Sequence, residues 1–440
     1  MSIHSSPLAI IPKFLWQPII ELVPTINLVA MTNISKKFAP VIDDQCKKRF
    51  LGISGIVVVE CKSKRINNFW SFALVNHNTY SDIIDALRAI SNQFSYSTVI
   101  GRFSKIPDIK KKIAYYKIFV NGCCYITDRY MHVNQCDTDL FELHFDNCGI
   151  ELIGEKQSQN KTVIRTHKNI QKKLIITISS CFTIKNISMY GIQLHIGRFT
   201  SSNDETKLCI SNCEFNNGFN LTIHSIDNVV IEKSSLRWFT VSIDSDIPKI
   251  NYTIAHNNFY YSNVCIDIKS QATESSIINI IGNTFSNHDV CIKFSGHLTE
   301  SSVININNNT ITKSKLLCDA SMINALISIC NNSISDLNSC INYHRDNCDM
   351  QFIFNGNICS NVKKLCWKTC RRISLVPPKI ACDITYNTLV DSMHDIYGEL
   401  KGYYDKSSRI NIIDNTIVNT YLLEDEASVE DIAMLFAQKN

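Results

Sequence analysis

The sequence predicts a solenoid of short parallel strands, because one phrase recurs at a nearly constant interval. The phrase reads apolar–any–apolar, two spacer residues, usually Asn, one further residue, and then Phe, Ile or Leu. Successive Asn positions are 26, 26, 23, 25, 30 and 28 residues apart. An interval in the twenties, built on alternating rather than helical units, is typical of a solenoid in which each repeat is one coil. The Asn positions are Asn257, Asn283, Asn309, Asn332, Asn357, Asn387 and Asn415.

Stacking of the coils gives the repeated Asn a physical role. One coil cannot bury its apolar face alone, so coils stack with their strands about 4.8 Å apart. Residues at the same phase then lie above one another, and a column of Asn can bond from coil to coil. Asn also tolerates the left-handed backbone that a tight corner needs. We therefore predict a parallel β-helix with a structural Asn ladder, which earlier units extend with Ile187, Cys213 and Ser234 at the Asn position.

The bulk composition excludes several partners. The chain has 440 residues and a formal net charge of +4, which is nearly balanced for this length. Such a balance gives no reason to expect nucleic acid or a membrane as the main partner. Short basic runs such as residues 110–112 have no stacked aromatic residues beside them. Residues 7–31 are rich in apolar groups, but Pro and charged residues interrupt them, so we expect no secretory signal.

The 19 cysteines behave as small hydrophobes. At a fixed distance after the Asn position, Cys265, Cys291 and Cys340 alternate with Leu317 and Leu365. No paired cysteines stand at zinc spacing, so we expect no metal site, no cofactor and no disulfide framework. Unpaired thiols on this scale favour a reducing compartment, cytoplasmic or nuclear.

The first 50 residues lack strand periodicity and read as short helices. An apolar-Pro start, a helix with Leu and an Ile pair, a second helix with Leu, and a Ser-Lys-Lys-Phe phrase follow in order. This segment resembles an F-box, although Phe14 replaces the usual acidic residue and Pro18 falls inside the first helix. The residues that carry the resemblance are Ile11, Pro12, Leu15, Ile19, Ile20, Leu22, Leu28 and Phe38.

The F-box resemblance implies a function for the whole chain. Proteins of that family dock their N-terminal helices onto a Skp-family adaptor, which joins them to a cullin scaffold, while the second domain holds a protein target. The resemblance therefore implies a substrate-recognition subunit of an SCF-type E3 ubiquitin ligase, with no catalysis of its own and an unidentified protein target. The docking face is expected to act by burying helices in a groove.

The remaining chain divides into three parts. Residues 51–80 are expected to join the small all-α domain of residues 1–50 to a β-helix of residues 81–423. A helix from Asp82 to about Asn92, with Ile83, Ile84 and Leu87 on one side, is expected to cap the open end of the first coil. A second capping helix is expected within residues 424–440. The cap and the first turns resemble those of pectin-lyase-like, right-handed parallel β-helices.

The alternative function is the binding or cleavage of polysaccharide by a lyase or hydrolase. Hydrolysis needs converging carboxylates, and the best candidates are Asp244, Asp246 and Asp267. A fibrous surface protein is a third possibility, against which the thiol content and the helical first segment both argue. A sugar-binding platform would draw on aromatic residues that are scattered in the sequence, namely Trp16, Tyr190, Trp238, Tyr260, Tyr261 and Trp367.

Overall fold

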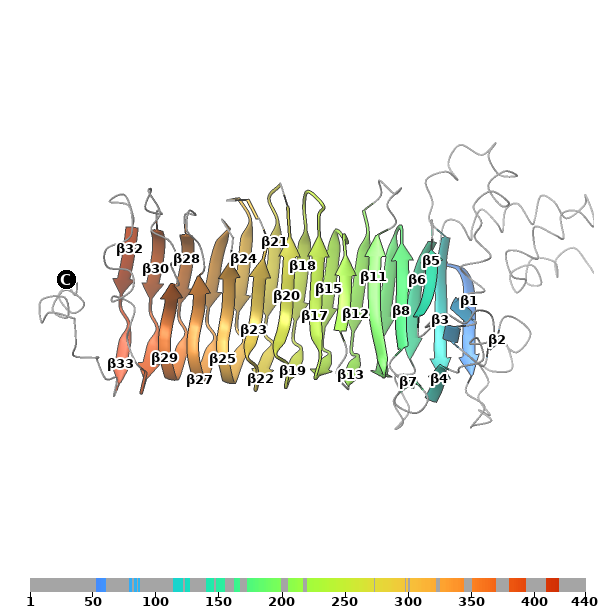
Figure 1. The fold of residues 1–440 in the computed structure, drawn as a ribbon, viewed down its shortest axis with the longest axis horizontal. Helices are drawn as coiled ribbons and strands as arrows, with labels where there is room; N and C mark the ends of the chain where they lie inside the picture. Colours follow the sequence, from blue (N-terminus) through green and yellow to red (C-terminus); the bar gives the residue numbers. More distant parts are fainter. Residues whose placement is uncertain are drawn as a thin grey trace, which may run out of the picture.

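The computed structural model describes a solenoid that begins at residue 53 and ends at residue 418 (Figure 1). The described residues are 53–60, 79–80, 83–84, 86–87, 114–121, 123–126, 140–145, 148–154, 162–166, 172–198, 205–216, 220–272, 274–296, 298–299, 301–321, 325–343, 350–368, 380–392 and 409–418. The N-terminal segment expected to be an F-box and the expected closing helix lie outside these residues.

One wall of the solenoid is a 14-stranded parallel sheet to which nearly every coil adds one strand. The pairing of β12 with β9 and β15 is parallel and in register, and the same pattern continues to the last coil. Its strands are β1 (Ile53–Glu60), β2 (Thr79–Tyr80), β3 (Ala114–Asn121), β6 (Cys148–Gly154), β9 (Cys181–Lys185), β12 (Lys207–Ser211), β15 (Asn228–Glu232), β18 (Asn251–Ala255), β21 (Ile277–Ile281), β24 (Val303–Asn307), β26 (Leu326–Cys330), β28 (Met350–Asn355), β30 (Ile380–Thr385) and β32 (Arg409–Ile413).

The other walls belong to a 19-stranded sheet. Its short strands are β4 (Cys123–Ile126), β7 (Thr162–Thr166), β10 (Ile187–Tyr190), β13 (Glu214–Asn216), β16 (Ser235–Arg237), β19 (Asn258–Tyr260), β22 (Thr284–Ser286), β31 (Thr388–Val390) and β33 (Thr416–Val418). Its long strands are β5 (Leu140–Phe145), β8 (Lys172–Ile178), β11 (Ile192–Arg198), β14 (Asn220–His224), β17 (Thr240–Ser245), β20 (Val264–Ser270) and β23 (Val290–Ser295). In three coils the short and the long strand form one continuous strand, namely β25 (Thr310–Ser321), β27 (Ser333–Tyr343) and β29 (Ile358–Lys368).

Each coil therefore turns three corners. The first corner joins the 14-stranded sheet to a short strand, the second joins the short strand to a long strand, and the third leads to the next coil. The fold is the parallel β-helix that the repeat predicts. Strand β1 pairs with β3 in parallel and lies inside residues 51–80, because its run of Val supplies a complete strand for the first coil.

A ladder of Asn side chains fills the first corner. The backbone N–H and the Nδ2 of Asn283 both donate to Oδ1 of Asn309, at 2.8 and 3.1 Å, and Nδ2 also donates to the Ile254 carbonyl of the preceding coil. The same pattern links every neighbouring pair from Asn257 to Asn415. The left-handed backbone falls on the residue before each ladder Asn, which is His256, Gly282, Asn308, Asn331, Gly356, Tyr386 or Asp414.

The core runs as a single buried cluster along the axis. Phe259 and Phe285 follow their ladder Asn by two positions, pair in register, and stack with ring centroids 4.9 Å apart. At the start of the solenoid, Ile83, Ile84, Ala86 and Leu87 are helical and buried in this same cluster, as a capping helix requires. Full burial of each large apolar side chain is worth about 1.5–3 kcal/mol.

The cysteines of the core are free thiols. Cys265, Cys291 and Cys318 are buried, and burial raises the pKa of each above its ordinary value, for Cys291 to about 12. A thiol held protonated in an apolar core is a poor nucleophile and metal ligand.

Candidate functional site

The outer face of the long strands carries the polar groups that the core does not use. Strand alternation points every second residue outward, and the parallel register aligns these residues in columns. His195 lies opposite Thr222, Ser242 lies opposite Asp267, and Asp267 lies opposite Lys293. A neighbouring column holds His224, Asp244 and Lys269. We call the following group the polar strip: His195, His224, Asp244, Asp267, Lys269 and Lys293.

Two histidines and one carboxylate form the centre of the polar strip. The rings of His195 and His224 stack at 6.4 Å between centroids, with 18° between their planes. Nδ1 of His224 lies 3.9 Å from Oδ2 of Asp244, and these two side chains are 50% and 60% exposed. Gly197 lies opposite His224 in the register, so no side chain of the preceding coil lies against His224 from that position. A solute therefore has access to a half-exposed imidazole that has a carboxylate close by.

His195 is the more buried of the two rings. Burial lowers its pKa to about 4, and the positive charge of Lys173 and the neighbouring His224 act in the same direction. His195 is therefore uncharged at neutral pH, so that one ring nitrogen accepts a hydrogen bond and the other donates one. Groups with strongly shifted pKa values on an accessible face are candidates for acid–base work.

The next coils place positive charge beside this centre. Nζ of Lys269 lies 3.6 Å from Oδ2 of Asp267, and Oγ of Ser295 donates to the other oxygen of Asp267 at 3.2 Å. The Lys269 side chain is half exposed, and Lys293 lies between Asp267 and Asp319 in the register. Two lysines thus follow the histidine–carboxylate centre along the axis.

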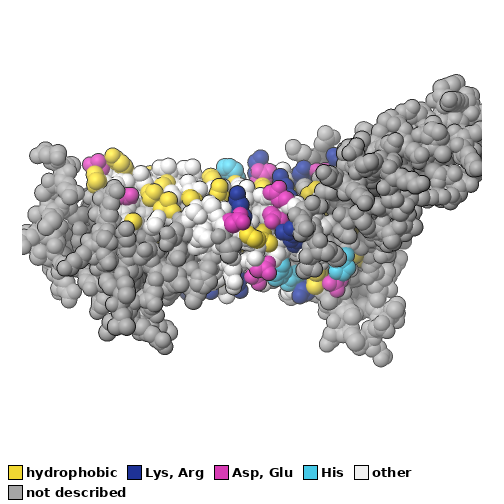
Figure 2. Space-filling model, turned by 90° about the horizontal axis from the view of Figure 1, so that it is seen from above, with side chains coloured by type: hydrophobic (Ala, Val, Ile, Leu, Met, Phe, Trp, Pro, Cys, Tyr) yellow, Lys and Arg dark blue, Asp and Glu magenta, His cyan; other side chains and the backbone are white. Residues whose placement is uncertain are grey.

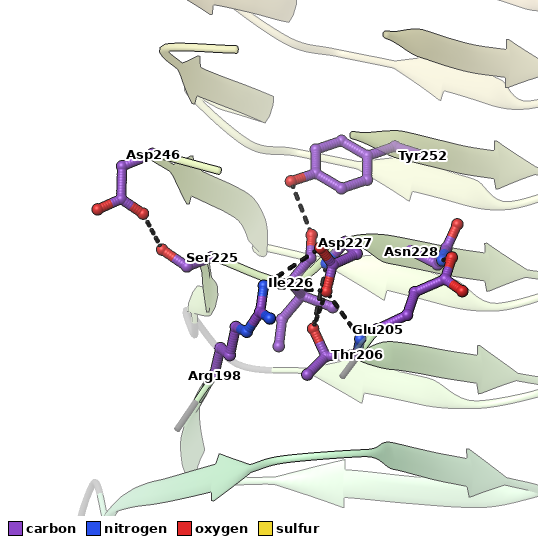
Figure 3. A network of polar contacts seen from close by, with 9 residues as sticks. All are labelled: Arg198, Glu205, Thr206, Ser225, Ile226, Asp227, Asn228, Asp246 and Tyr252. Carbon is purple, nitrogen blue, oxygen red and sulfur yellow. Dashed lines mark hydrogen bonds and ion pairs between the residues drawn. The ribbon is translucent and has the colours of Figure 1, made fainter. Parts of the chain in front are cut away.

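A hydrogen-bonded network closes the third corner beside the polar strip (Figure 3). Nη1 of Arg198 lies 3.3 Å from both carboxylate oxygens of Asp227, and the backbone N–H and hydroxyl of Thr206 each donate to Asp227 at 2.7 Å. The Tyr252 hydroxyl donates to the Ile226 carbonyl at 3.1 Å. A half-buried ion pair with this many partners holds the corner in one geometry.

Figure 2 views the molecule from the side on which this corner lies. Acidic, basic and histidine side chains gather there over the middle of the solenoid, whereas uncharged polar and apolar side chains cover the part toward the last coils. On the visible part of this face, most charged side chains therefore lie over the middle coils, with isolated acidic side chains toward the last coils.

The three candidate carboxylates do not converge. Asp244 and Asp246 both point outward, and Asp267 lies on the next coil, opposite Ser242. Asp246 accepts a hydrogen bond from Ser225 at the third corner, whereas Asp267 is held by Lys269 and Ser295. Only Asp244 stands beside an imidazole, so the arrangement does not fit a pair of hydrolytic carboxylates.

The structure describes most of the aromatic residues that were considered for a sugar-binding platform. Trp238 and Tyr261 stack at the second corner, while Tyr190 and Tyr260 are half-buried. Trp367 lies opposite Asn342 in the register, and Trp16 is outside the described residues. The expected adaptor-binding residues, Ile11 to Phe38, also lie outside them. The sequence reasoning missed His195 and His224, whose signal is an outward position in two successive long strands, in the middle of β11 and at the end of β14.

Within the described ranges, no group of three or more His, Cys, Asp and Glu side chains is arranged to hold a metal ion. A helix with the length and apolar character needed to cross a bilayer is not found in that part of the chain.

The solved structures that match this chain include two of low similarity. The periplasmic alginate epimerase AlgG aligns with a TM-score of 0.35 and 14% identity, over 70% of this chain and 78% of its own. The mannuronan C-5 epimerase AlgE6 A-module of Azotobacter vinelandii aligns with a TM-score of 0.32 and 11% identity, over 79% of this chain and 96% of its own. No family model and no curated protein matches the chain.

These findings correct three expectations. The structures found are polysaccharide epimerases with this fold, which does not agree with the expected ubiquitin-ligase receptor. Both of those proteins are enzymes, whereas we expected a chain without catalysis. One of them is periplasmic, whereas we expected a cytoplasmic or nuclear location. The F-box resemblance covers only the first segment, which lies outside the described residues, and it carries no information about the chemistry of the β-helix.

Proposed function

We propose that this chain processes an anionic polysaccharide on the polar strip, by removing the proton next to a sugar carboxylate. The observation that supports this most is the row of His195, His224 and Asp244, followed along the axis by Lys269 and Lys293. A base and a source of positive charge are the two things that this reaction needs.

The chemistry assigns a role to each group. A carbon–hydrogen bond next to a carboxylate gives up its proton only when the negative charge that develops on the carboxylate is neutralised. Lys269, half exposed and one coil away from Asp244, supplies that charge by exchanging its ion pair with Asp267 for one with the sugar carboxylate. His224 takes the proton, and Asp244 beside Nδ1 stabilises the imidazolium that forms.

The same proton removal can lead to two products, an epimerised sugar or a cleaved chain. The C5–H bond of a uronate breaks, its proton goes to His224, and its electron pair forms an enediolate with the carboxyl group. Return of a proton from solvent to the opposite face gives the epimer, and His224 then releases its proton to solvent. Loss of the C4 oxygen, which takes a proton as it leaves, gives chain cleavage with a C4–C5 double bond. Both outcomes begin with the same proton removal.

Hydrolysis is the less suitable chemistry for this face. It needs two carboxyl groups on either side of one glycosidic bond, one of them held protonated. Here Asp267 is paired with a lysine and Asp246 is bonded into the corner, which leaves Asp244 alone beside His224.

The test is an assay on defined uronate polymers. Polymannuronate and polygalacturonate serve as substrates, with a neutral β-glucan as the uncharged control, and products are followed by NMR and by the ultraviolet absorbance of unsaturated ends. We expect His224→Ala to lower turnover by about 10²–10⁴-fold and Asp244→Asn by a smaller factor. Glu232→Gln, on the 14-stranded sheet, removes a carboxylate from another wall and should leave turnover unchanged. Equal turnover by wild type and His224→Ala would refute the proposal.

The lysines give a second, independent readout. Lys269→Met should weaken binding of the charged polymers and leave any weak binding of the neutral glucan unchanged. Because the half-exposed lysine acts through its charge, the loss should shrink as salt is raised.

A further inference from the structure

The second corner contains two aromatic residues in an unusual backbone conformation. In successive coils the residue at this corner has a positive φ, and it is Gly191, Asn287, Lys313, Asp336, Asn361 or Asp391 in most of them. In two adjacent coils it is Trp238 and Tyr261, each with φ 57°. A bulky L-residue in the left-handed region is rare and costs free energy that Gly or Asn does not.

These two rings are also turned toward the solvent. Trp238 is 54% exposed and Tyr261 is 41% exposed, whereas Phe239, next to Trp238, and Phe259, two positions before Tyr261, are buried. The rings stack with centroids 5.2 Å apart and planes at 19°, and the guanidinium carbon of Arg237 lies 5.6 Å from the Tyr261 centroid. Tyr386 at the first corner has a similar φ of 56° and is 62% exposed, so backbone strain alone does not mark a site. Trp238 and Tyr261 differ from it because they stack on each other in adjacent coils and present one continuous aromatic surface to solvent.

The aromatic pair and the polar strip share the same strands. Trp238 lies just before β17, which carries Asp244 near its far end, and Tyr261 lies before β20, which carries Asp267 and Lys269. Between them, the outward residues of β17 are Thr240 and Ser242. Six strand residues span about 20 Å, a length that several linked sugar rings cover.

We propose that Trp238, Tyr261 and Arg237 form a sugar-stacking subsite for the same polysaccharide chain that reaches His224 and Asp244, an inference that rests on the proposed function. The hydrogen-bearing face of a pyranose ring is weakly positive and packs on the negative face of an aromatic ring. Arg237 donates hydrogen bonds to hydroxyl or carboxylate oxygens of that sugar. A protein partner would need a wider apolar surface than two rings provide.

The experiment compares the binding of short and long oligosaccharides. Affinity for mannuronate and galacturonate tri- and hexasaccharides is measured by calorimetry for wild type, for the double variant Trp238→Asn/Tyr261→Asn, and for Trp238→Phe. Asn suits the left-handed corner, so the double variant should fold with a melting temperature no lower than that of wild type by more than a few degrees. We expect a hexasaccharide to bind wild type at least about tenfold more tightly than the double variant. The trisaccharide, too short to span the strands, should bind the two proteins equally, and Trp238→Phe should retain most of the hexasaccharide affinity.

The outcomes separate the two proposals. Equal hexasaccharide affinity in wild type and the double variant, with turnover still dependent on His224, would refute the subsite and leave the proposed function intact. Absence of binding of either hexasaccharide to wild type would refute both. Loss of affinity confined to the hexasaccharide, in a variant that melts like wild type, would support the subsite.

Discussion

The first and second corners of the solenoid have the same backbone turn and different side chains. Both place one residue with positive φ in each coil and follow it with a buried position. In the first corner that position is Asn in seven successive coils, each bonded to the next. In the second corner it varies, and includes Ser262, His288, Ser314, Leu337 and Val362. The turn alone therefore does not require Asn, and the regular ladder is a device for stability, whereas the irregular corner leaves room for other functions.

The largest effect is expected from breaking the ladder. Asn309→Leu removes the acceptor for the backbone N–H of Asn283 and the donor to the Ile280 carbonyl, both buried. We expect the free energy of unfolding to fall by about 1–3 kcal/mol, measured by denaturant titration. Asn305→Leu is the matched control, because Asn305 donates to Asn279 on the half-buried outer face and should cost less. An equal loss in both variants would contradict a special role for the ladder.

A smaller loss is expected from the turn residue before the ladder. Gly282 has φ +65°, and a Cβ added there would lie 2.6 Å from Nδ1 of His256. Gly282→Ala should lower the free energy of unfolding by about 1–2 kcal/mol. Asn308→Ala, at the same corner of the next coil, keeps an existing Cβ and should cost less; the reverse order would show that the His256 contact is not a constraint.

The second corner should make the stability of the protein depend on pH. His288 is buried, its Nδ1 accepts a hydrogen bond from the backbone N–H of Ser262 at 3.0 Å, and Nε2 donates to the Phe259 carbonyl at 3.0 Å. Burial lowers the pKa of His288 below its ordinary value of 6.5. Below pH 6.5 the unfolded chain binds a proton that the folded chain resists, so stability falls as the pH falls.

The matched variant is His288→Ser, which places there the residue found at Ser262 and Ser314. Thermal melts from pH 7 downward should show a shallower loss of melting temperature in this variant than in wild type. His195 contributes with the same sign as the pH falls from 6.5 to about 4, so part of the slope should remain. Identical slopes would exclude His288 as a source of the acid sensitivity.

The smallest effect is expected beside that corner. Lys315 and Asp289 form an ion pair at 2.8 Å, with side chains 69% and 49% exposed. Lys315→Ala should change the free energy of unfolding by less than about 0.5 kcal/mol, since exposed pairs gain little in water. A loss comparable with that of Asn309→Leu would mean that the second corner depends on this pair.

The contrast between the corners also explains what the sequence can predict. The Asn spacing predicts which residues become vertical neighbours, because one strand phrase per coil is enough to set the register. It does not predict how far the solenoid extends, since β1 lies before the first clear repeat. The site is harder to predict because outward residues obey no repeat. His195 and His224 lie two register positions apart on adjacent coils, and their rings meet diagonally across the strands. The aromatic pair at the second corner likewise depends on a turn that the sequence pattern does not mark.

The most direct test of the central claim is deuterium exchange at the sugar carbon. Polymannuronate and polygalacturonate are incubated with the protein in D₂O, and deuterium at C5 is measured by NMR and mass spectrometry. We expect wild type to introduce deuterium at C5, with or without chain cleavage, and His224→Ala to introduce none above background. Uronate polymer that binds wild type but keeps all of its C5 protons would contradict the account.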